Sequence, residues 1–99
     1  MENYLTTLSQ WIAKSTIDDI PDSVIEHSKL VLADTIGAIA GGSAELEINK
    51  LSKTLSDDGQ VPIIGTSFKS TMENAAFLNG TAGTFLEMDE GNQYARGHP

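Results

Sequence analysis

The longest helical pattern in the sequence limits the fold more than any other feature. From Asp22 to Ser43, apolar and small side chains recur on one face at α-helical spacing for more than about four turns. Pro21 and Asp22 suit the first turn, where a proline loses no hydrogen bond and a carboxylate meets the positive end of the helix dipole. The face consists of Val24, Ile25, Ser28, Val31, Leu32, Thr35, Ile36, Ile39 and Ala40. We expect Gly41 and Gly42 to end this helix.

Three other segments, residues 3–14, 44–55 and 73–88, also show helical patterns. Because Gly91 and Asn92 both tolerate left-handed backbone angles, we expect the last of these helices to stop there and an ordered loop to begin. The apolar face of the first segment consists of Tyr4, Leu5, Leu8, Trp11 and Ile12, and that of the second consists of Ile48, Leu51 and Leu55.

Residues 61–66, with the sequence VPIIGT, are the one plausible β-strand. Pro62 cannot donate a hydrogen bond to a central ladder, so this strand belongs at an edge or stands alone. The preceding Asp57-Asp58-Gly59 is expected to form an exposed turn. No repeat, low-complexity segment or linker marks a domain boundary. The sequence therefore predicts one mainly α-helical domain with at most one short extended strand.

Two of the predicted helices carry lines of small residues. A glycine inside a helix costs about 1 kcal/mol relative to alanine, and close packing of another backbone would explain that cost. Our hypothesis is that the two helices cross at short range through these faces of small residues, and a bulky substitution at Gly37 or Gly80 tests it. The alternative is that the glycines only end or kink their helices. The first line contains Ala33, Gly37, Ala40 and Gly41, and the second contains Ala76, Gly80 and Gly83.

Composition narrows the possible functions. The 99 residues include six basic and fourteen acidic side chains, and the formal charge of -8 repels a phosphate backbone, so DNA and RNA are poor partners. The absence of cysteine excludes a disulfide scaffold and thiolate metal sites. Together with the lack of an early apolar segment, it favours a cytoplasmic protein that enters no membrane. His27 and His98 lack metal-binding spacing, so no metal site is expected.

The segment FLEMDEGNQYARGHP, residues 85–99, gathers charged and polar groups. Glu87, Asp89 and Glu90 lie close together in the sequence, and closely spaced carboxylates are a common basis for acid/base chemistry. Arg96 and His98 add one cation and one imidazole a few residues later. His98 is therefore an acid/base candidate. The alternatives are a solvated helix end for the carboxylates and a structural role for His98.

Three stretches of the sequence together resemble the N-terminal part of the MmgE/PrpD family. They are HSKLVLADTIGAIAGGS, VPIIGT and, most specifically, NAAFLNGTAGTFLEMDEGNQYARGHP, so the resemblance covers nearly the whole chain. The family includes 2-methylcitrate dehydratases, cis-aconitate decarboxylases and iminodisuccinate epimerases. The resemblance implies the helical domain of a homodimeric lyase or isomerase that needs no metal or other cofactor. It also implies proton transfer beside a carboxylate of a small di- or tricarboxylate.

The resemblance also implies site residues. Family members carry a leucine-aspartate-aromatic-aspartate-aspartate-threonine run and a later His-Pro beside the active site. Here residues 86–91 occupy the run and residues 98–99 are the His-Pro. The resemblance thus implies catalytic roles for His98 and Asp89 and substrate contacts from Glu87, Asn92 and Arg96. Glu87 replaces an aspartate and Gly91 replaces a threonine, so we expect substrate contacts to differ from those of the dehydratase and decarboxylase branches.

The family's catalytic lysines and second histidine lie in sequence beyond the matched part. The resemblance therefore implies that residues 1–99 are the N-terminal portion of a longer enzyme, inactive and marginally stable alone. The alternative is a non-catalytic acidic helical module that binds a protein partner. The coding sequence after residue 99 distinguishes them, because continuation into lysine-bearing sequence supports the enzyme and a stop codon supports the module.

Overall fold

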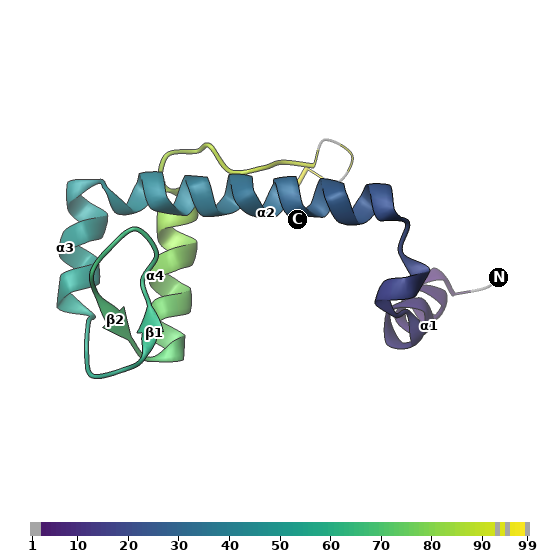
Figure 1. Ribbon diagram of the computed structural model, residues 1–99, viewed down its shortest axis with the longest axis horizontal. Helices are drawn as coiled ribbons and strands as arrows, with labels where there is room; N and C mark the ends of the chain where they lie inside the picture. Colours follow the sequence, from purple (N-terminus) through teal and green to yellow (C-terminus); the bar gives the residue numbers. More distant parts are fainter. Residues whose placement is uncertain (1–2, 93, 95, 99) are drawn as a thin grey trace. The chain divides into compact units, whose positions relative to one another are not determined.

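The computed structural model describes residues 3–92, 94 and 96–98. Within this part of the chain it is mainly helical, as predicted (Figure 1). The chain divides into two compact units, Met1–Leu30 and Val31–Pro99, and the division falls inside one helix. Across the described residues, no helix combines the length and apolar character needed to cross a membrane. The elements are α1 (Tyr4–Lys14), a 3-10 helix η1 (Ile17–Asp19), α2 (Asp22–Ser43), α3 (Leu46–Thr54), β1 (Val61–Pro62), β2 (Lys69–Ser70) and α4 (Met72–Phe85).

In the N-terminal unit, α1 confirms the predicted first helix and has local caps at both ends. At its start the Oδ1 atom of Asn3 accepts a hydrogen bond from the backbone N–H of Leu5 at 3.1 Å. At its end the hydroxyl of Ser15 donates to the backbone oxygen of Trp11 at 2.6 Å. The predicted apolar face stays exposed, since no residue of α1 is buried. Local capping, rather than a core, therefore defines this helix within its unit.

A compact turn follows α1. The Oδ2 atom of Asp19 accepts hydrogen bonds from the backbone N–H of Thr16 at 2.8 Å and from its hydroxyl at 3.0 Å. These two bonds, the backbone bond first, hold the pKa of Asp19 below its ordinary value of 3.8 because they stabilise the charged carboxylate. The turn leads directly into α2, which begins at Asp22 after Pro21, as predicted.

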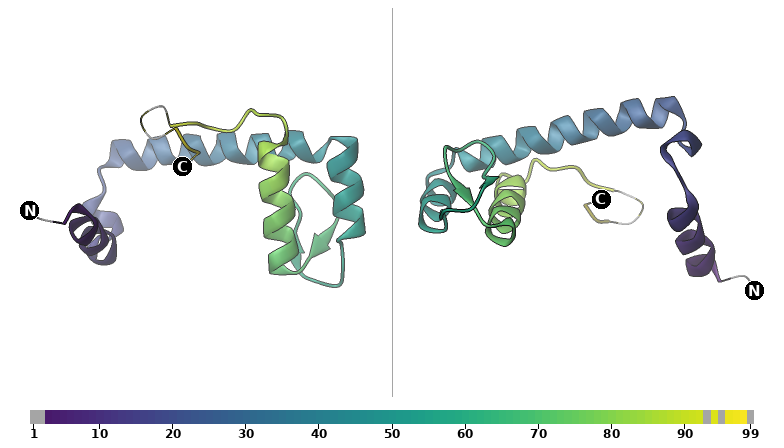
Figure 2. Two further views of the ribbon diagram at one scale, coloured as in Figure 1. Left: turned by 180° about the vertical axis from the view of Figure 1, so that it is seen from behind. Right: turned by 60° about the horizontal axis from the view of Figure 1, so that its bottom comes forward.

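The C-terminal unit builds a small core where the β1–β2 hairpin lies against α4 and beside α3 (Figures 1 and 2). Ile63, Ala75 and Leu78 are fully buried there, at 1%, 0% and 0% exposure. Partly buried side chains from α3 and the hairpin surround them, namely Leu51, Leu55, Val61 and Phe68. The predicted apolar side of the third helix thus faces this core, and Ile48 on the same helix is also buried.

The hairpin contains a second strand that the sequence pattern did not indicate. Val61 pairs with Ser70 and Pro62 with Lys69 in an antiparallel ladder, so Pro62 lies on an edge as expected. The second strand is only two residues long, too short for an alternating pattern. The side chain of Asn79 in α4 makes two hydrogen bonds to the backbone in and just after β1. Its oxygen accepts from the N–H of Ile64 at 2.9 Å, and its amide nitrogen donates to the carbonyl of Pro62 at 3.3 Å. A tertiary contact therefore supports the pairing.

The helix crossing lies at other glycines than Gly37 and Gly80. The two helices do approach closely, but a Cβ built on Gly37 or on Gly80 meets no atom within 4 Å beyond its own helix, so these two positions do not take part in the crossing. The close approach is at Gly42, where a Cβ would lie 1.9 Å from the backbone oxygen of Ala82. The prediction that Gly41 and Gly42 end α2 is therefore wrong, because Gly42 is a packing residue within the helix. The helix continues to Ser43, and Gly42 serves as the contact surface for α4.

The end of α4 also differs from the prediction. The helix stops at Phe85, well before Gly91 and Asn92, and the left-handed residue after it is Glu87, with φ of 55°. Left-handed residues after a helix are usually glycine, so nothing in the sequence indicated this backbone conformation at a glutamate. The early stop releases residues 86–92 from the helix and makes them part of the loop that carries the candidate site.

Candidate functional site

The candidate site lies in the loop that follows α4, within the C-terminal unit. Glu87, with its left-handed backbone, turns the chain away from the helix axis. From there the loop leads to α2, where the hydroxyl of Thr35 lies 3.3 Å from the Oε2 atom of Glu90 (Figures 1 and 2). The loop is therefore attached at both ends of its acidic part, to α4 by chain continuity and to α2 by this contact.

His98 meets two oxygen atoms of the acidic segment. Its Nδ1 atom lies 3.0 Å from the Oδ2 atom of Asp89 and 2.6 Å from the backbone oxygen of Glu90. A carbonyl and a carboxylate only accept hydrogen bonds, so Nδ1 carries the hydrogen. In the neutral ring this leaves the lone pair on Nε2, which is the arrangement of a general base.

The side chains of Asp89 and His98 differ in burial. The side chain of Asp89 is 12% exposed and that of His98 is 64% exposed. The carboxylate therefore lies behind the imidazole, and the ring faces the surroundings. An acidic partner behind a histidine both orients the ring and stabilises the positive charge that develops when Nε2 takes up a proton.

A tight turn brings Arg96 to the same place. The backbone N–H of Asn92 donates to the carbonyl of Gly97 at 2.7 Å, and the Oδ1 atom of Asn92 accepts from the N–H of Tyr94 at 2.9 Å. Arg96 has a left-handed backbone, with φ of 50°, inside this turn. The result is a shallow concavity of about 370 Å³ in which a cation and an imidazole are neighbours. Its lining residues are Gly91, Asn92, Arg96, Gly97 and His98.

The structure thus brings together four of the five predicted site residues. Asn92, Arg96 and His98 line the concavity, and Asp89 contacts His98 from behind. Glu87 is exposed and is not among the described residues that line it. Pro99, the second residue of the His-Pro motif, lies outside the described residues. The catalytic and substrate-binding roles of these residues stay predictions.

Thr35 is the residue of this region that the sequence did not single out. Its hydroxyl lies 3.0 Å from the backbone oxygen of Val31 and also reaches Glu90, 55 residues away in the sequence. The available signal was a hydroxyl on a mostly apolar helix face, which it shares with Ser28. That signal is weak, because serine and threonine often bond to the carbonyl one turn earlier in a helix.

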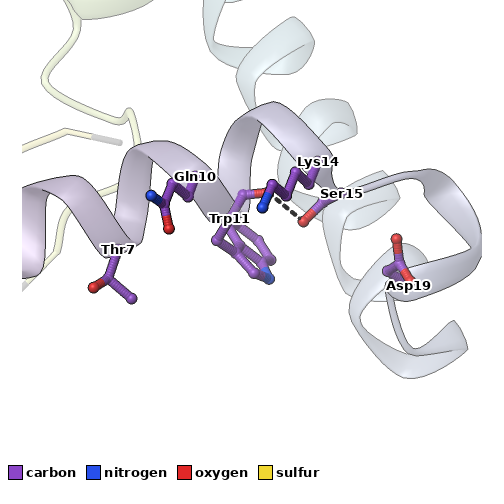
Figure 3. A pocket seen from close by; sticks show the side chains of 6 residues that line it. All are labelled: Thr7, Gln10, Trp11, Lys14, Ser15 and Asp19. Atoms are coloured by element: carbon purple, nitrogen blue, oxygen red, sulfur yellow. Dashed lines mark hydrogen bonds between the residues drawn. The ribbon is translucent and has the colours of Figure 1, made fainter.

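A second concavity, of about 480 Å³, lies in the N-terminal unit (Figure 3). It contains no imidazole, and the carboxylate of Asp19 at its edge already accepts two hydrogen bonds from Thr16. Elsewhere too, the described residues contain no group of three or more His, Asp and Glu side chains arranged to hold a metal ion. The loop site is therefore the better candidate for chemistry. The N-terminal concavity is lined by Thr7, Gln10, Trp11, Lys14, Ser15 and Asp19.

Comparison with known proteins places the chain in a family. No curated protein and no solved structure matches it. The family model of the MmgE/PrpD N-terminal domain does match, over residues 6–99, a range that begins within α1 and includes all the candidate site residues. The mainly helical fold agrees with a helical N-terminal domain. On this match, the chain belongs to the MmgE/PrpD family.

Proposed function

We propose that this chain is the N-terminal portion of the helical domain of a metal-independent lyase or isomerase that acts by proton transfer on a small di- or tricarboxylate. Family membership supports the class of reaction, since the family includes dehydratases, decarboxylases and epimerases of such acids. The observation that carries the proposal is the contact of His98 Nδ1 with Asp89 and Glu90, which leaves Nε2 free to act as a base beside Arg96.

In the proposed step, Nε2 of His98 removes a proton from a carbon next to a substrate carboxylate. The C–H bond breaks, an N–H bond forms on the ring, and the electron pair delocalises into the adjacent carboxylate. Asp89 stabilises the imidazolium through Nδ1, and Arg96 pairs with the carboxylate on which negative charge grows. In a dehydratase the imidazolium then gives its proton to the hydroxyl group on the neighbouring carbon, and the C–O bond breaks to release water as the C=C bond forms. In an epimerase a second acid on the opposite face of the planar intermediate supplies the proton to carbon, because return from His98 would regenerate the substrate.

Arg96 is one cation, whereas a tricarboxylate substrate carries three negative charges that need positive partners in the active site. The chain carries six basic against fourteen acidic residues, so further positive charge must come from elsewhere in the active enzyme. The proposal therefore assigns the remaining cations to sequence beyond residue 99 or to the second subunit of a homodimer in the cytoplasm.

The test uses the protein as expressed from its own gene, with 2-methylcitrate, cis-aconitate and iminodisuccinate as substrates. His98→Gln removes the base and is expected to lower kcat by about 10²–10⁴-fold, the usual contribution of a positioned acid/base group. His27→Gln is the matched control, since His27 is an exposed residue of α2, and it should keep the rate of the parent protein. Full activity of His98→Gln would overturn the assignment of the base, and no turnover of any substrate by the parent protein would contradict the proposed class.

A further inference from the structure

Thr35 differs from the other hydroxyl residues that bond back within their helices. Ser28, Thr54 and Thr81 each donate to the backbone oxygen four residues earlier, at 2.8, 2.9 and 2.7 Å. The single hydroxyl hydrogen of Thr35 has two acceptors, the backbone oxygen of Val31 at 3.0 Å and the Oε2 atom of Glu90 at 3.3 Å, so it is shared between a bond within the helix and one to the loop. Thr35 therefore connects α2 to the segment that holds His98.

Glu90 links Thr35 to His98, because its side chain contacts the first residue and its backbone oxygen contacts the second. Its side-chain Oε2 meets the hydroxyl of Thr35 at 3.3 Å, and its backbone oxygen lies 2.6 Å from Nδ1 of His98. Both Thr35 and Glu90 are partly buried, so solvent competes less for this contact than for one on the open surface. A shift of Glu90 away from Thr35 moves the carbonyl that accepts from His98.

Loss of that carbonyl would leave Asp89 as the acceptor for Nδ1 at 3.0 Å. The imidazole of His98 is 64% exposed, so water competes for both ring nitrogens once one of the two protein acceptors is gone. The hydrogen would then be shared between Nδ1 and Nε2, and the share of rings with a free Nε2 lone pair would fall.

We infer that Thr35 is a positioning residue for His98: through Glu90 it holds the acceptor that keeps the imidazole hydrogen on Nδ1 and the lone pair on Nε2. The inference deepens the proposed function, because it names a residue of α2 that prepares the same base. Thr35 itself does not touch the concavity that His98 lines.

The experiment is ¹⁵N NMR of the histidine side chains in the protein labelled at histidine, above the pH at which the rings are protonated. His98→Gln assigns the His98 signals, and His27, on an exposed position, supplies the reference for a solvated ring. The variants are Thr35→Val, which removes only the hydroxyl, and Thr35→Ser, which keeps it. Thr81→Val in α4 is the matched control, because it loses a bond within its own helix.

We expect His98 of the parent protein to show more Nδ1–H form than His27. Thr35→Val should shift the signals of His98 toward those of His27, whereas Thr35→Ser and Thr81→Val should leave them in place. Glu90→Ala should give the same shift, and adding Thr35→Val to it should give no further change. Glu90→Ala on its own decides the matter if Thr35→Val fails to fold, because unchanged His98 signals in Glu90→Ala would then overturn the inference.

Unchanged His98 signals in Thr35→Val, or an additional shift when it is combined with Glu90→Ala, would overturn the inference. Failure of the proposed function gives a different result. In that case the NMR shifts occur as described and His98→Gln still turns over substrate at the rate of the parent protein.

Discussion

At the scale of single residues, hydrogen bonds to carboxylates organise both units of the chain. Asp19 accepts two bonds from Thr16, and Asp89 lies 3.0 Å from Nδ1 of His98. The two bonds from Thr16 hold the pKa of Asp19 below 3.8. The folded pKa is lower than the unfolded one, so the contribution of Asp19 to stability is present above about pH 3.8 and is lost as the pH falls through the folded value.

A ¹³C NMR titration of the Asp19 carboxyl group checks this directly. The midpoint should lie below 3.8 in the parent protein. Thr16→Val should raise it only part of the way, because the backbone bond, which has the larger effect, remains. A midpoint at or above 3.8 in the parent protein would contradict the hydrogen-bonded turn described between α1 and α2.

The sequence indicated most of the chemistry-bearing residues but little of their geometry. Asp89, Arg96 and His98 follow from the charged groups of the terminal segment itself, whereas the resemblance to a family motif supplies their roles and adds Asn92 as a substrate contact. Thr35 was assigned to an apolar face, since one sequence does not reveal a partner 55 residues away. The left-handed Glu87 was missed for a related reason, because a non-glycine residue adopts this backbone when its surroundings require it.

At the scale of elements, the crossing of α2 and α4 depends on a backbone contact. A Cβ on Gly42 would lie 1.9 Å from the oxygen and 2.8 Å from the carbonyl carbon of Ala82, and neither can move without shifting α4. The approach at Gly83 is looser, since a Cβ built there would lie 3.2 Å from the Cγ1 atom of Ile39. Helical periodicity located the helices, and the lines of small residues indicated that two of them meet. The register of the contact depends on how the helices pack, which one helix alone does not specify.

Two glycine-to-alanine substitutions within α2 distinguish the effect of packing on stability from the effect of helix propensity. Gly42→Ala should lower the free energy of unfolding by about 1–3 kcal/mol, the usual cost of overpacking, because it forces α2 and α4 apart. Gly37→Ala is the matched control, and it should raise the free energy of unfolding by up to about 1 kcal/mol because nothing lies near its Cβ. Urea unfolding measures both values. Equal effects of the two substitutions would show that the glycine contact is not where the structure has it.

At the scale of the whole chain, little apolar surface is buried within either unit. Trp11 and Ile12 of α1 are 58% and 62% exposed, and Ile36 of α2 is 44% exposed. Exposed apolar side chains at helical spacing are typical of surfaces that contact other protein. This agrees with the proposal that the chain is one portion of a larger helical domain, and the buried cluster around Ile63, Ala75 and Leu78 is its local core.

The most direct test of His98 as the base is a crystal structure of the protein, as expressed from its own gene, with a small tricarboxylate such as citrate bound. We predict that the ligand occupies the concavity lined by Asn92, Arg96 and His98, with a carboxylate on Arg96 and Nε2 of His98 facing a carbon beside that carboxylate. Nδ1 should still face Asp89 and Glu90. A ligand bound elsewhere, with Nε2 of His98 turned away from it, would contradict the claim that His98 is the base.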